Sequence, residues 1–225
     1  MNTDRTCLVQ NMLIIMKILL FTMLVLKPQN ANAEDVIQYI KTLYHQTNIT
    51  LAERKAQEML IHTGPPDYGP GSNENKKEKW YKIGHSEDMK VFEGSDYKAK
   101  VYFQNNKVIK VIIVSIGEGW NDSVEYYFYP GGTTAFVFER LKTMQGYNTD
   151  KEEPLPPGPY IVEWRTYFDK TGKIIKELKK AFYESNNEDI PLKYVRTSIM
   201  NYGYYYHDYL SFPFSAIIKA ELKLH

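Results

Sequence analysis

The chain has 225 residues, of which 43% are hydrophobic, with 28 basic and 27 acidic side chains. This composition is typical of a folded domain with its own core, and it excludes a largely disordered or fibrous chain. The near balance of charge also argues against a nucleic-acid partner, because such proteins need a basic excess to neutralise phosphates.

The first 33 residues have the pattern of an export signal. An apolar run over residues 18–26 follows Lys17, and Ala31-Asn32-Ala33 supplies the small residues of a cleavage site. The apolar run is shorter than the roughly 20 residues that a membrane-spanning helix needs. We therefore expect a start at Met16, cleavage after Ala33, and a periplasmic or secreted protein with no stable membrane span.

Residues 34–63 are predicted to form two helices that act as an arm or cap. Asn48 is expected to end the first helix, and Thr50 followed by Glu53 matches a capping box that would open the second. The Gly/Pro-rich stretch 64–79 then reads as a loop. Apolar residues recur at the helical period in the first helix, at Val36, Ile37, Ile40, Leu43 and Tyr44.

From Trp80 to the C-terminus the sequence predicts a twisted antiparallel sheet, built as a meander of hairpins. A Tyr-Phe pair precedes a turn three times, at residues 102–103, 127–128 and 167–168. The predicted fold class is therefore α+β, with two N-terminal helices followed by this sheet. Residues 148–159 hold four prolines and are expected to form a surface loop.

The turns also predict the strand register. A three-residue loop in the second hairpin pairs Phe128 with Thr134 and Tyr126 with Phe136, so that Phe138 and the other large residues share one face. The same loop length in the third hairpin pairs Phe168 with Ile174, Trp164 with Leu178 and Tyr160 with Phe182, and it places Gly172 at a positive φ.

Two parts of the predicted sheet do not follow a regular hairpin pattern. The first hairpin needs a bulge or a longer turn, because a plain Asn-Asn turn puts Lys110 opposite Val101. The third return strand also has a helical spacing, so a helix is the alternative there. Near the C-terminus we expect a turn over residues 186–191, a strand over 194–200 and a closing strand over 217–224.

The sequences of the predicted hairpins resemble those of a known group of proteins. Residues 163–176, and 125–128 together with 136–138, are similar to the Tyr-Phe, turn, Gly-Lys-Ile hairpins of exported bacterial proteins of uncharacterised function. They are also distantly similar to MORN-type repeats, which form open antiparallel sheets of successive hairpins. The resemblance covers residues 97–182 and implies a sheet-forming module without implying a reaction.

Motifs for catalysis or metal binding are not recognised in the chain. There is no His-Glu-x-x-His, Walker loop, dinucleotide fingerprint or Gly-x-Ser-x-Gly, and the single cysteine, Cys7, lies in the predicted signal. The loop Gly117 to Asp122 lacks the alternating ligands of a calcium site. We therefore expect no metal and no cofactor.

Tyrosine, with 19 residues, is the one unusual feature of the composition. Exposed aromatic rings can stack on sugars or fill a partner's pocket. The alternative is that these rings pack on the sheet with their hydroxyls in water. The candidate ligand-binding residues, for a glycan or an envelope protein, are Trp120, Tyr147, Tyr204, Tyr205 and Tyr206.

The function expected from the sequence is that of an exported soluble protein, a non-enzymatic binding or structural module of the cell envelope. A hydrolase acting on an envelope or extracellular polymer is an alternative, with His207 and Asp208 as its candidate proton-transfer residues. A second alternative is an inhibitor or immunity-type protein-binding module.

Overall fold

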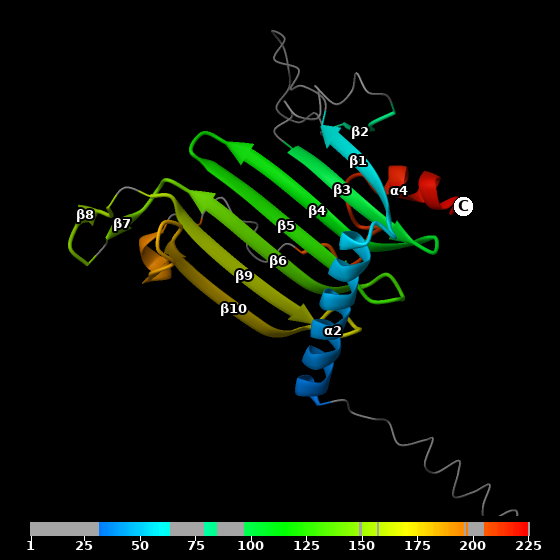
Figure 1. Ribbon diagram of the computed structural model, residues 1–225, viewed down its shortest axis with the longest axis horizontal. Coiled ribbons are helices and arrows are strands. Elements are labelled where there is room, and N and C mark those ends of the chain that lie inside the picture. Colours follow the sequence, from blue (N-terminus) through cyan, green and yellow to red (C-terminus); the bar gives the residue numbers. More distant parts are fainter. Residues whose placement is uncertain are drawn as a thin grey trace, which may run out of the picture. The chain divides into compact units, whose positions relative to one another are not determined.

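The main element of the computed structural model is an open antiparallel sheet, drawn in Figure 1. The structure describes residues 32–63, 79–84, 97–148, 150–156, 158–195, 197 and 205–224. Apart from Asn32, Ala33 and Lys79, the predicted export signal and the predicted 64–79 loop lie outside these residues. In the described part of the chain, no helix combines the length and the apolar character needed to cross a membrane.

Nine strands pair in the order β11-β10-β9-β6-β5-β4-β3-β1-β2, and every neighbouring pair is antiparallel. The α+β class with a sheet of hairpins is thus confirmed. The strands are β1 (Gln57–Thr63), β2 (Trp80–Lys82), β3 (Tyr97–Gln104), β4 (Lys107–Gly117), β5 (Trp120–Phe128), β6 (Thr134–Thr143), β9 (Tyr160–Phe168), β10 (Ile174–Tyr183) and β11 (Asp189–Ile190).

Shorter elements surround this sheet. A separate two-stranded ribbon, β7 (Tyr147–Asn148) with β8 (Glu153–Pro154), lies in the proline-rich loop. The helices in the described residues are α2 (Ala33–Ala52), the short 3-10 helix η1 (Leu192–Tyr194) and α4 (Ser215–Leu222).

The prediction of two N-terminal helices is wrong, because α2 is one helix that continues through Asn48. The Asn48 amide lies against the sheet, with Oδ1 3.3 Å from Lys110 Nζ, so it has a polar partner without leaving the helix. The helix ends instead at Ala52, and Arg54 follows it with a φ of 55°, so that the Lys55 N–H donates to the Thr50 carbonyl at 3.0 Å. This is a Schellman-type end rather than a capping box.

The predicted second helix is replaced by strand β1. Its residues alternate, with Met59 and Ile61 buried on one face of the sheet, and it pairs with β3. A short apolar run is ambiguous between helix and strand, and the open edge of β3 decides it here because pairing satisfies the backbone of both strands.

Each of the three hairpins contains a bulge near the start of its return strand, after two residues in the first hairpin and after one residue in the other two. The register shifts between Tyr102 and Phe103 in the first, between Tyr127 and Phe128 in the second, and between Ile174 and Lys176 in the third. The bulge that the sequence required in the first hairpin is therefore confirmed. The residues looped out on the return strands are Ile109, Ala135 and Ile175.

The register predicted for the other two hairpins is right at the first pair and wrong beyond it. Phe128 does pair with Thr134, but Tyr126 then pairs with Val137 rather than with Phe136. The third hairpin behaves in the same way, since Trp164 pairs with Lys179 rather than Leu178. A bulge moves all later side chains of a strand to the opposite face, which the turn alone does not reveal.

The sheet consequently has two distinct buried faces. The α2 face carries Tyr127, Phe136 and Tyr167 against the apolar stripe of the helix. The α4 face carries Tyr126 and Phe128, which pack with Phe212, Phe214 and the buried residues of α4. The predicted single aromatic face is therefore divided between the two sides.

The C-terminal strand predicted over residues 217–224 is wrong. Residues 215–222 form α4, whose Ile218 and Leu222 are buried one turn apart, and Lys223 ends it with a φ of 53°. Of the strand expected over residues 194–200, Tyr194 belongs to η1 and Val195 forms an isolated antiparallel bridge with Gly146, while residues 196 and 198–200 lie outside the described part. An apolar run of eight residues suits either structure, and packing of one helix face on the sheet favours the helix.

Residues 205–214 form a segment that crosses the turns of the second and third hairpins on the α4 face. The Thr134 N–H donates to the His207 carbonyl at 2.8 Å. At Gly172, whose φ is 84°, an added Cβ would lie 2.4 Å from the His207 ring. At Gly119, whose φ is 75°, an added Cβ would meet nothing within 4 Å.

The two glycines therefore make a matched test of this segment. Ala at either position adopts the left-handed region, which costs about 1–2 kcal/mol. We expect Gly172→Ala to lower the free energy of unfolding by clearly more than Gly119→Ala, in urea denaturation. The excess should disappear when His207 is also changed to Ala, and equal losses for the two single variants would contradict the packing of His207 on this turn.

Candidate functional site

The aromatic residues predicted to bind a ligand do not form one open surface in the described residues. Trp120 begins β5, and its indole fills the space beside Gly117, where a Cβ would lie 2.2 Å from the ring. It packs with the apolar cluster on the α4 face of β6 and β9. Tyr147 lies in β7 with its side chain outside the described residues, and Tyr204 lies outside them altogether.

Tyr205 and Tyr206 pack on the α4 face of the sheet. The Tyr205 hydroxyl accepts a hydrogen bond from Thr166 at 3.1 Å, and its ring meets that of Phe168 edge-on at 5.4 Å. The Tyr206 ring lies 4.4 Å from that of Phe212. These two tyrosines therefore have the packing role that was the alternative interpretation of the tyrosine cluster.

The candidate proton-transfer residues, His207 and Asp208, make local structural contacts. The His207 ring lies against Gly172 in the third hairpin turn. The Asp208 carboxylate accepts hydrogen bonds from the Leu210 N–H at 2.9 Å and the Ser211 hydroxyl at 2.8 Å, which closes the turn that follows it. The His207 contact joins the 205–214 segment to the sheet, whereas the Asp208 hydrogen bonds order a turn within that segment.

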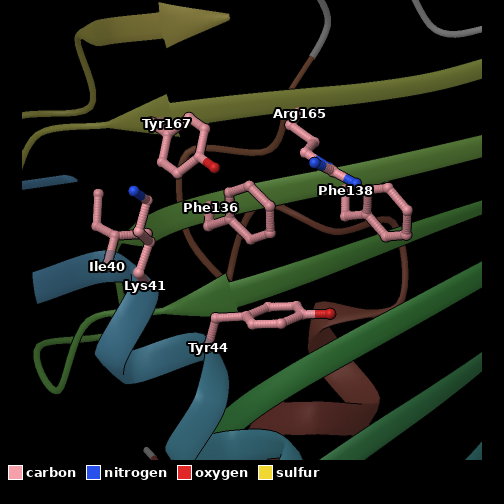
Figure 2. A pocket seen from close by; sticks show the side chains of 7 residues that line it. All are labelled: Ile40, Lys41, Tyr44, Phe136, Phe138, Arg165 and Tyr167. Atoms are coloured by element: carbon pink, nitrogen blue, oxygen red, sulfur yellow. The ribbon is translucent and has the colours of Figure 1, made fainter. Parts of the chain in front are cut away.

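A cavity of about 280 Å³ lies between α2 and the sheet, and Figure 2 shows its lining. In the ladder between β6 and β9, Phe136 pairs with Tyr167 and Phe138 with Arg165, so these four side chains stand side by side under the helix. The cavity is lined by Ile40, Lys41 and Tyr44 from α2, by Phe136 and Phe138 from β6, and by Arg165 and Tyr167 from β9.

Aromatic rings form most of the cavity wall. The Phe136 ring centroid lies 4.8 Å from that of Tyr167 and 5.6 Å from that of Tyr44, which meets it edge-on at 88°. Phe136 and Tyr167 are buried, whereas the Tyr44 side chain remains 37% exposed. Apolar walls of this kind are typical of small-molecule sites, which usually enclose about 300–1,000 Å³.

Two cationic side chains accompany these rings. Figure 2 shows the Arg165 side chain reaching toward Phe138. The guanidinium lies over the Phe138 ring, 5.5 Å from its centroid. Arg165 Nη2 is 2.9 Å from Glu163 Oε2, and the Arg165 side chain is 42% exposed. Lys41 lines the cavity from the helix side and is exposed. The cavity thus joins an apolar body to positive charge.

A buried polar network fixes α2 on the sheet beside the cavity. Lys110 Nζ lies 2.8 Å from Glu125 Oε2, and the Tyr127 hydroxyl donates to the same oxygen at 2.6 Å. Asn48 Oδ1 lies 3.2 Å from that hydroxyl. Burial, followed by the charge of Glu125, raises the pKa of Tyr127 well above its usual value, so the phenol stays a donor. The helix wall of the cavity is therefore firmly placed.

The opposite face holds a buried pair of carboxyl groups. Asp122 on β5 and Glu139 on β6 are only 2% and 1% exposed. Burial, and then the charge of Glu139, raise the pKa of Asp122 to about 8, against a hydrogen bond from the Ser123 backbone that lowers it. The two carboxyls therefore hold a shared proton at neutral pH.

Sequence reasoning missed the cavity although it had identified several of its residues. The sequence identifies Tyr44 only as part of the helix stripe, and the predicted register places Phe136 and Phe138 on the same face as Tyr126. The available signal was the bulge required in the first hairpin. Because all three hairpins share the Tyr-Phe-turn layout, the same bulge in the second would have moved Phe136 and Phe138 to the helix side.

Comparisons of the chain with protein-family models, with curated proteins and with solved structures gave no match.

The carboxyl pair predicts a particular pH dependence of stability. Since its folded-state pKa is raised, Asp122 binds a proton in the folded state that the unfolded chain has lost, between about pH 4 and pH 8. Folding therefore weakens as the pH rises through this window, because the folded protein must either keep this proton or bury a second charge. Asp122→Asn removes the effect while keeping a hydrogen-bond donor toward Glu139.

We expect urea unfolding to show the Asp122→Asn protein gaining stability relative to wild type as the pH rises from about 5 to 7. The matched control is Asp150→Asn, because Asp150 is exposed and lies in the loop between β7 and β8. A difference between Asp122→Asn and wild type that stays constant with pH would contradict a protonated pair.

Proposed function

We propose that this protein is an exported, non-enzymatic binding protein of the cell envelope, with its ligand in the cavity between α2 and the sheet. The observation that carries the proposal is the lining of about 280 Å³ of space by aromatic side chains from two strands and a helix. The signal pattern over residues 1–33 supports export.

The energetics of the cavity support ligand binding. A ligand that covers the walls removes apolar surface from water, which contributes about 25 cal/mol for each Å². The surface that it would cover includes the half-buried Phe138 ring and the Tyr44 ring, which is 37% exposed.

The walls of the cavity are also preorganised. The Lys110, Glu125 and Asn48 network holds the helix in place, and the β6–β9 ladder holds Phe136 against Tyr167. When a site is already formed, binding does not carry the entropic cost of ordering its side chains. This favours a role as a receptor for a small molecule over a role in which the helix rearranges.

The cavity lies apart from the aromatic residues that the sequence favours as ligand contacts. Trp120, Tyr205 and Tyr206 pack against other side chains of the α4 face. A glycan needs open ring faces on which to stack. The α2 face offers a hollow site instead, and a compact apolar ligand fits that shape better than an extended polymer does.

The test uses N-phenylnaphthylamine, a neutral apolar dye whose fluorescence rises in apolar surroundings. Phe138→Trp enlarges a half-buried wall residue and should reduce the affinity for the dye at least about tenfold, equivalent to about 1.4 kcal/mol. Leu210→Trp adds the same indole to an exposed site on the 205–214 segment and should leave the affinity unchanged.

Thermal melts of both variants would check that each remains folded. The proposed function is rejected if wild type does not bind the dye, or if both tryptophan variants bind it as wild type does.

A further inference from the structure

The positive charge around the cavity exceeds the negative charge near it. Glu163 Oε2 lies 2.9 Å from Arg165 Nη2 and 3.2 Å from Lys180 Nζ, so one carboxylate serves two cations. Lys41 adds a third cation from the helix. Among the described residues that line the cavity, none is acidic. The site therefore has an unbalanced positive charge at its opening.

Arg165 is suited to receive an anion in addition to Glu163. A guanidinium carries five N–H donors in a planar fork, and the contact with Glu163 involves one of its terminal nitrogens. The Phe138 ring supports the face of the guanidinium, which leaves its edge for hydrogen bonds. At 42% exposure the side chain is accessible from the cavity opening.

The walls favour an aromatic ligand over an aliphatic one. Four rings line the cavity, and Tyr44 stands edge-on to Phe136. Aromatic pairs gain about 0.5–1.5 kcal/mol beyond the area they bury, through edge and offset contacts that a flat ligand can extend. The volume, just below the usual range for ligand pockets, limits the ligand to a small ring system.

We infer that the ligand is a small aromatic acid, with its rings among Tyr44, Phe136 and Tyr167 and its anionic group on Arg165. This inference rests on the proposed function, since it names the chemical class that the same cavity selects. Arg165 supplies the direct contact to the anion, and Lys41 adds longer-range attraction that weakens with salt.

Two dyes with a common ring skeleton separate charge from apolar contact. Anilinonaphthalene sulfonate carries one anionic group, whereas N-phenylnaphthylamine carries none. Arg165→Met should weaken binding of the sulfonate at least about tenfold and leave the neutral dye within about twofold of wild type. Lys41→Met should give a smaller loss for the sulfonate alone, and this loss should shrink at high salt.

Lys219→Met is the matched control, because it removes one exposed cation from α4 on the other face. It should change neither affinity. Glu163 keeps Lys180 as a partner in the Arg165→Met protein, and a melting curve would show whether that protein is folded. Lys41→Met tests the same charge from an exposed helix position if Arg165→Met unfolds the chain.

The outcomes distinguish the inference from the proposed function. If the neutral dye binds and Arg165→Met weakens both dyes alike, or neither, the anionic ligand is rejected while the binding cavity stands. If the neutral dye binds and the sulfonate does not, the inference is rejected as well. If wild type binds neither dye, the proposed function itself fails. Selective loss of the sulfonate in Arg165→Met supports the inference.

Discussion

The bulge at Ala135 is the constraint on which the rest of the structure depends. It moves one residue of β6 out of register directly after the turn, so that Phe136 pairs with Tyr127 and with Tyr167 on its two sides. Phe136 and Phe138 are thereby directed toward α2, and Glu139 toward the opposite face. A regular hairpin would exchange these positions, because a shift of one residue reverses the face of every later side chain. One backbone irregularity thus creates the cavity and buries a carboxyl group.

As a result, the two faces of the sheet are covered by different elements. On the α4 face the 205–214 segment and α4 cover the apolar surface, and the Asp122 and Glu139 pair costs stability as the pH rises. In the described part of the chain, α2 packs on the other face, and the rings of β6 and β9 beside it line a cavity with positive charge next to it. The ligand that we propose would pack against these rings.

The sequence was informative where the local chemistry decides the structure. The α2 stripe, the Tyr-Phe hairpins and the positive φ of Gly172 all follow from side-chain spacing or turn residues. It was uninformative where tertiary packing decides, as in β1 and in residues 217–224, where short apolar runs suit both helix and strand. The cavity belongs to this second group, because it exists only once the bulge has placed β6 residues under the helix.

Nuclear Overhauser contacts between selectively labelled aromatic rings measure most directly on which face of the sheet the Phe136 side chain lies. We expect cross-peaks from Phe136 to Tyr44 and Tyr167, whose centroids lie 5.6 Å and 4.8 Å away. Cross-peaks from Phe136 to Tyr126 or Phe212, with none to Tyr44, would show a regular hairpin. That result would remove the cavity and the function proposed for it.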